Sequence, residues 1–115
     1  MIIAALELTI TFYATSLKEK RSVVRRVLAR ARAEFNVAAN EVDELDNPGG
    51  AVLGFCACGR DKRYLEGQLQ ALERFIDELE LCEIVDAQRS LTVPFFGDDD
   101  DDATVREDAD GSDGD

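Results

Sequence analysis

The chain has 115 residues and a formal net charge of −12, from 25 acidic and 13 basic side chains. Residues 97–115 hold ten acidic residues and one Arg, so residues 1–96 carry 15 acidic and 12 basic residues, a net charge of about −3. This length suffices for one two-layer core, which excludes a multidomain enzyme or a membrane transporter. The sequence contains no His, which excludes imidazole bases and His-ligated metal sites.

The first predicted element is a half-buried strand at residues 3–12. Apolar and polar residues alternate along it with a period of two, which is typical of a strand with one face in the core. The residues that share the apolar face are Ala4, Leu6, Leu8, Ile10 and Phe12.

A long amphipathic helix is predicted next, over residues 17–35. Ser16 lies three residues before Glu19, the capping-box spacing that satisfies free backbone amides at a helix start. No Gly or Pro interrupts the stretch, and its apolar residues recur at helical spacing. These residues are Leu17, Val24, Val27, Leu28, Ala31 and Phe35.

A β-hairpin is predicted in the middle of the chain. Residues 36–45 form its first strand, and Asn-Pro-Gly-Gly at 47–50 forms the turn, because Pro fixes φ and Gly supplies left-handed positions. Residues 51–58 are almost entirely apolar, as expected of a central strand.

A second helix and a last strand complete the predicted order. Asp61 is the expected N-cap of this helix, and Leu65, Leu69, Leu72, Ile76 and Leu79 keep helical spacing after it. Residues 81–93 return to β character before Pro94 ends the strand.

The order β-α-β-β-α-β predicts a ferredoxin-like α+β fold for residues 1–96, with two helices on one face of a four-stranded antiparallel sheet. Right-handed crossovers would leave the first and third strands central. A pair of βαβ-type halves exchanged in a dimer is the alternative.

Four stretches of the sequence resemble the YlxP-like family of small bacterial proteins, and the resemblance covers about residues 1–93. The most specific stretch is Ser-Leu-Lys-Glu-Lys-Arg at 16–21, followed by Val-Val at 23–24. The others are Phe-Asn-Val at 35–37, Glu-Val-Asp at 41–43 and Ala-Val-Leu-Gly at 51–54.

The resemblance implies a ferredoxin-like fold and a cytoplasmic protein. Members are often encoded beside a ribosome-binding factor and a translation initiation factor, which implies work related to the ribosome. The family carries no established catalytic residues to transfer, and the acidic end of this chain departs from the family's usual ending.

A basic strip on the first predicted helix is the candidate binding site. At 100° per residue, four of the seven basic residues between 18 and 32 fall within an arc of about 60° beside the apolar stripe. Such a strip can follow a phosphate backbone, as ribosomal RNA would offer, or it can be an ordinary solvated helix face with Glu19 and Glu34 as partners. Basic residues in a first helical turn oppose the macrodipole, which favours the functional interpretation. The candidate nucleic-acid-binding residues are Lys18, Arg21, Arg25 and Arg32.

The other candidate features have structural interpretations. Phe55 is expected in the core or at a subunit contact, because no RNP-like run surrounds it. Cys56 and Cys58 share one strand face and are expected to pack as small apolar side chains, with a redox pair as the alternative; the only other Cys is Cys82, too few for a four-ligand metal site. The acidic residues at positions 41, 43, 44 and 46 are expected to protect an edge strand from aggregation rather than to bind a cation.

Residues 97–115 are predicted to be disordered, because they are poor in apolar residues and self-repelling. They would either compete with nucleic acid for the basic strip or keep the protein soluble in a salt-rich cytoplasm. The excess of Arg over Lys, ten against three, favours salt adaptation or a GC-rich genome. The odd Cys count and the lack of a signal peptide favour the cytoplasm.

These observations predict a non-enzymatic accessory protein without a cofactor or a metal, which contacts ribosomal RNA or a ribosome-assembly partner through its first helix. The alternative is a protein-interaction or structural module without affinity for nucleic acid. A homodimer is expected in either case, since the third predicted strand is apolar on both faces and the uncovered sheet face would need a partner.

Overall fold

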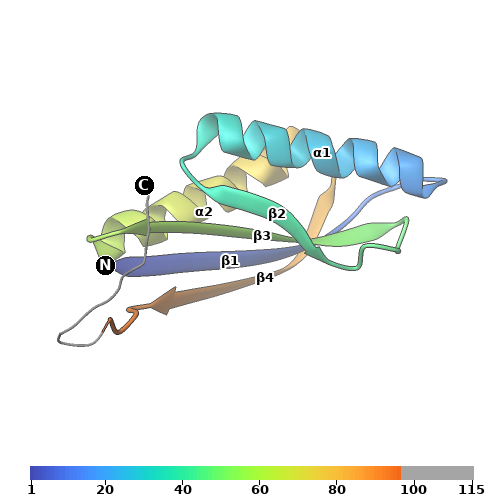
Figure 1. Cartoon of the computed structure of the whole chain (residues 1–115). Coiled ribbons are helices and arrows are strands. Elements are labelled where there is room, and N and C mark those ends of the chain that lie inside the picture. The colour runs from blue at the N-terminus through green and yellow to red at the C-terminus, as the bar shows by residue number, and fades with distance from the viewer. Residues whose placement is uncertain (97–115) are drawn as a thin grey trace.

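The computed structural model describes residues 1–96 and has the predicted order of elements (Figure 1). The predicted disordered segment, 97–115, lies outside the described residues. The elements are β1 Ile2–Thr11, α1 Leu17–Glu34, β2 Ala38–Asp43, β3 Gly50–Gly59, α2 Lys62–Leu79 and β4 Glu83–Thr92.

The four strands form one antiparallel sheet in the order β2-β3-β1-β4, so β1 and β3 are central as predicted. β1 pairs with β3 over its whole length, from Ile2 opposite Gly59 to Thr11 opposite Gly50. Irregularities interrupt both outer pairings, one between Glu41 and Asp43 and one opposite the Thr9–Ile10 step. The extra residues at these points bend and twist the edge strands, as β-bulges do.

Both helices lie on the same face of the sheet and leave the opposite face uncovered (Figure 1). The core lies between the two layers: alternate residues of β1 and β3 face the helices, and Val27, Leu69 and Leu72 meet them from above. The ferredoxin-like α+β fold is therefore confirmed. The buried residues of the two central strands are Ala4, Leu6, Leu8, Ile10, Ala51, Leu53, Phe55 and Ala57.

The helix ends follow the sequence pattern. Asp61 caps α2 as predicted, since its Oδ1 accepts hydrogen bonds from the amides of Arg63 and Tyr64 at 2.9 and 3.2 Å. α2 ends at Glu80, which adopts the left-handed conformation with φ 57°. Neither helix within residues 1–96 has a stretch apolar enough to cross a membrane.

Candidate nucleic-acid interface

The start of α1 is fixed by a reciprocal cap. Oγ of Ser16 accepts a hydrogen bond from the amide of Glu19 at 3.2 Å, as the spacing predicted. The carboxylate of Glu19 accepts in return from the amide and the hydroxyl of Thr15, at 2.8 and 2.9 Å. These two bonds hold the pKa of Glu19 below its usual range, because they favour the charged carboxylate. The cap sets where the helix begins and therefore which basic residues share a side.

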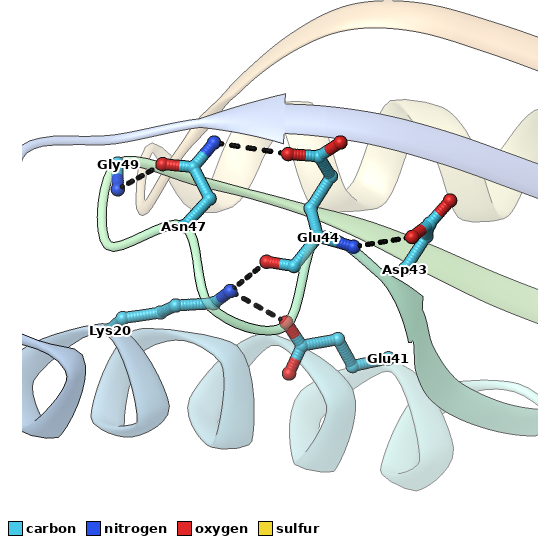
Figure 2. A network of polar contacts seen from close by, with 6 residues as sticks. All are labelled: Lys20, Glu41, Asp43, Glu44, Asn47 and Gly49. Atoms are coloured by element: carbon cyan, nitrogen blue, oxygen red, sulfur yellow. Dashed lines mark hydrogen bonds and ion pairs between the residues drawn. The ribbon is translucent and has the colours of Figure 1, made fainter.

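Lys20 does not belong to the exposed basic surface, although it lies within the basic stretch of the sequence. Its side chain is 1% exposed and turns inward from α1 (Figure 2). Its Nζ lies 2.9 Å from Oε2 of Glu41 on β2 and also donates to the backbone oxygen of Glu44. Within residues 1–96 this ammonium is the only partner of Oε2 of Glu41, which is itself buried. Lys20 thus joins the first turn of α1 to the end of the edge strand.

The bond from Lys20 is part of a network that shapes the β2–β3 connection (Figure 2). Glu44 has φ 62°, and its amide donates to Oδ1 of Asp43 at 2.8 Å. Asn47 donates to Oε1 of Glu44 at 3.3 Å and accepts from the amide of Gly49 at 3.0 Å. The carboxylates of Glu41, Asp43 and Glu44 thus hold a buried ammonium and a turn, a structural role that the sequence did not predict. β2 is an edge strand of the sheet, and protection of this edge from aggregation stays a prediction. Residues 1–96 contain no group of three or more Cys, Asp or Glu side chains placed to hold a metal ion.

The four predicted binding residues are all exposed, but they do not have equal freedom. Arg32 donates from Nη2 to the backbone oxygen of Ala39 at 2.6 Å and thereby ties the end of α1 to β2. Lys18, Arg21 and Arg25 form no ion pair and no side-chain hydrogen bond with any of residues 1–96. Three cations of the predicted strip therefore have no partner among residues 1–96, and the fourth forms a structural hydrogen bond.

A further arginine of α1 faces the second helix instead. The guanidinium of Arg30 lies 5.9 Å from the ring centroid of Phe75 on α2, within cation–π distance. Phe75 in turn meets Phe35 edge to face, with the ring centroids 5.5 Å apart. This side of α1 therefore packs against α2. Lys18, Arg21 and Arg25 share the opposite side of the helix with Arg32, which bonds to Ala39 of β2.

The uncovered face of the sheet has no aromatic platform on β3. Phe55 is 3% exposed and packs in the core between sheet and helices, which confirms the core interpretation. Stacking of RNA bases on strand aromatics, as in an RRM, would need such a ring on the open face. β3 therefore offers no ring for base stacking of the RRM type.

The cysteines correct the packing prediction. Cys56 and Cys58 are both exposed, on the uncovered face of β3, because Ala57 between them takes the inward position. Cys82 alone is partly buried; burial first, and the neighbouring charge of Asp77 second, raise the pKa of its thiol to about 11. The exposed pair was missed because an almost continuous apolar run hides which alternate residues face solvent.

The Lys20–Glu41 pair was also missed at the sequence level, although a signal for it exists. At 100° per residue Lys20 falls in the middle of the apolar stripe, between the directions of Val27 and Ala31, rather than beside it. A lone Lys in that position needs a buried acidic partner. Glu41 meets this need from β2.

Comparison with known proteins finds a family match over most of the described chain. A family described as "Protein of unknown function (DUF503)" matches residues 3–89. The uncharacterized protein YlxP of Bacillus subtilis (strain 168) is 37% identical over 68 residues, which cover 59% of this chain and 74% of that protein.

Two solved structures that resemble this chain are designed proteins. The de novo designed protein Foldit4 aligns with a TM-score of 0.47 and 15% identity, over 82% of this chain and 98% of that one. LFR1 1, a de novo designed protein with a ferredoxin fold, aligns with a TM-score of 0.48 and 17% identity, over 86% of this chain and 91% of that one.

Proposed function

The chain belongs to the DUF503 family of proteins of unknown function, and we propose that this member is a non-catalytic cytoplasmic accessory protein that contacts RNA, ribosomal RNA first of all, through α1. The observation that carries the proposal is a set of three exposed cations, Lys18, Arg21 and Arg25, that form no ion pair within the described part of the chain. We call them the α1 cation set. Phosphate oxygens are the natural partners of such groups, and Arg can bind them through two parallel hydrogen bonds.

The position of the α1 cation set supports a ligand outside the chain. Lys18 and Arg21 lie in the first turns of the helix, where positive charge opposes the helix dipole and costs a few tenths of a kcal/mol or more per residue. Glu19 is the one carboxylate of the first turn, and its charged form, which the bonds from Thr15 favour, offsets part of this cost. A bound phosphate chain would add further negative charge beside Lys18 and Arg21.

The spacing of the α1 cation set fits a strand-like polyanion. Lys18 and Arg25 are seven residues apart on one side of the helix, which corresponds to about 10 Å along its axis. Charges distributed over such a length meet successive phosphates rather than a single anion. The chain's overall acidity does not prevent this, because a local basic strip acts at short range.

The proposal of a non-catalytic role follows from the residue types available. The sequence has no His and no Gly-rich phosphate loop, and the structure engages the carboxylates of Glu41 and Glu44 in the Lys20 network. General acid–base catalysis needs a positioned pair with a free proton acceptor. Binding by charge needs only the exposed cations.

The test is RNA binding by the full chain, and by a chain ending at Phe96, across a salt series. The shortened chain is included because the ten acidic residues of 97–115 would compete with RNA for the cations. Three phosphate contacts on single-stranded RNA predict a slope of about −2 in log affinity against log salt. A ribosomal subunit is the second ligand measured.

A variant with Ala at all three positions of the α1 cation set should lose most of this affinity and its salt slope. The matched control replaces three exposed basic residues of α2, Lys62, Arg63 and Arg74, and changes the net charge equally. Equal binding by both variants, or no binding by either wild-type chain at low salt, would contradict the proposal.

A protein-interaction role is the second candidate, and exposed apolar side chains favour it. On the edge strands Val42 and Val85 are 47% and 53% exposed, and Phe95 and Phe96 follow β4 with 87% and 78% exposure. An apolar surface of this kind is typical of an interface, here with a second copy of the chain. Light scattering over a concentration series should then show a dimer, and a monomer at every concentration would exclude the homodimer.

A further inference from the structure

Two thiols stand side by side on the face of the sheet that the helices leave uncovered. Cys56 and Cys58 are two residues apart on β3, and both are exposed. In the neighbouring central strand their partners are Ala5 and Ile3. On the other side Ala38 of β2 lies opposite Cys56. The pair therefore stands among small and apolar side chains.

We propose that Cys56 and Cys58 form a chelating site for a soft monovalent metal cation, copper(I). This site lies on the sheet face opposite the helices and is independent of the α1 cation set. Binding involves no change in oxidation state: each thiol releases its proton to solvent, and two sulfur–copper bonds form.

The donor atoms around the pair select a soft ion. The thiols line a shallow hollow of about 530 Å³, in which Met1 and Asn36 are the other residues with side-chain donor atoms. Among residues 1–96, no carboxylate and no basic side chain lines it. Thiolate and thioether sulfur favour copper(I), whereas magnesium, calcium and manganese require oxygen ligands. Met1, whose thioether is a weaker sulfur donor, also lines this hollow.

The spacing of the two residues suits a bridge through a metal better than a disulfide. Same-face neighbours in a strand are about 6.5–7 Å apart between Cα atoms. Disulfides need Cα atoms usually below about 6.8 Å and Cβ atoms near 3.8 Å, whereas these side chains project in parallel. A linear sulfur–metal–sulfur bridge with bonds of about 2.3 Å spans about 4.6 Å, so each sulfur needs to lean only about 1 Å toward the other.

The number of available sulfur ligands also favours a monovalent ion with a low coordination number. Structural zinc takes four tetrahedral ligands, and residues 1–96 contain no group of three or more Cys, Asp or Glu side chains that could hold a metal. Two thiolates satisfy an ion that accepts two sulfur ligands. They leave half of the coordination shell of zinc unfilled.

Cys82 provides an internal control of the same chemistry. Its thiol is partly buried, away from the pair, and burial raises its pKa to about 11. The thiolate is the metal-binding form of cysteine, so Cys82 stays protonated and inactive near neutral pH. The contrast separates a site made by two neighbouring thiols from nonspecific binding to any cysteine.

The test offers copper(I) to the full chain without oxygen, in competition with the coloured chelator bathocuproine disulfonate. The wild-type chain and Cys82→Ser should each withdraw one copper(I) per chain from the chelator. Cys56→Ser and Cys58→Ser should each lose this uptake. Because both positions are exposed, the variants should keep the fold, which far-UV circular dichroism checks; Ala variants at the same positions repeat the measurement.

Three results would overturn the proposal. The first is a wild-type chain that takes no copper(I) from the chelator. The second is uptake that survives both Ser substitutions in the pair or disappears in Cys82→Ser. The third is tighter retention of zinc(II) than of copper(I) against a matched chelator, which would exclude the soft monovalent ion.

Discussion

Replacing Lys20 with Met is expected to be among the most damaging single changes in this domain. The Lys20 side chain is 1% exposed, and its partner Glu41 is 16% exposed. Removing one member of a buried ion pair costs about 3–5 kcal/mol, because the other charge stays buried without a partner. Since Glu41 retains some contact with water, we expect a loss of about 3 kcal/mol. For a domain of about 100 residues this lowers the melting temperature by roughly 12–24 °C.

Thermal and urea unfolding of Lys20→Met, followed by circular dichroism, measure this loss. Lys18→Met is the matched control, and we expect it to change stability by less than about 0.5 kcal/mol, since Lys18 is exposed. Lys20→Met/Glu41→Leu removes both charges and should return to within about 1 kcal/mol of the wild type. Two results would refute the view that the two charges are buried and depend on each other. One is a decrease of less than about 1 kcal/mol in the free energy of unfolding of Lys20→Met. The other is a double variant that is no more stable than Lys20→Met.

Three further changes test the turn, the sheet and the helix cap. Glu80→Gly should stabilise the domain by about 0.5–1 kcal/mol in urea unfolding, because Glu80 ends α2 at φ 57° and Gly adopts this conformation without strain. Gly54→Ala should destabilise by about 1–3 kcal/mol, since a Cβ there would lie 2.8 Å from Cγ1 of Val42; adding Val42→Ala should recover most of this loss. Glu19→Gln should be less stable than the wild type at about pH 7, because the lowered pKa of Glu19 means that its charged carboxylate stabilises the fold. This contribution is fully present above the ordinary pKa of Glu and is lost as the pH falls through the folded pKa, so the difference between the two proteins should close in acid. A difference that stays constant with pH would contradict the assigned role of Glu19.

Local pattern was sufficient to predict the fold, because each element carries its own periodicity and its own stop signals. Asp61 and Ser16 are predicted caps that the structure confirms. The bounds shift mainly in the second strand, predicted at 36–45 and found at Ala38–Asp43. There the chain turns early, because Glu44 adopts a positive φ that the sequence pattern does not reveal for a non-glycine residue.

The site was harder to predict, because it depends on contacts between elements far apart in the chain. Counting the basic residues of α1 identifies the candidates but does not distinguish the buried Lys20 from the exposed Arg21. Nor does it distinguish Arg25 from Arg32, whose guanidinium donates to the backbone oxygen of Ala39. These distinctions follow from the position of β2 beneath α1. The exposure of Cys56 was also not predicted, because the sequence of a central strand can be apolar throughout even where helices cover only one of its faces.

Most side chains with a resolved role in the most distinctive run of the sequence, residues 16–21, stabilise the fold. Ser16 and Glu19 form the helix cap, and Lys20 is the buried partner of Glu41. Resemblance to the family in this run therefore reports chiefly on how α1 begins and docks on β2. Two charged residues of the run, Lys18 and Arg21, form no ion pair and no side-chain hydrogen bond within residues 1–96. A ligand on α1 is thus to be sought through these two residues and the next turns of the helix, and variants of the rest of the run would measure stability instead of binding.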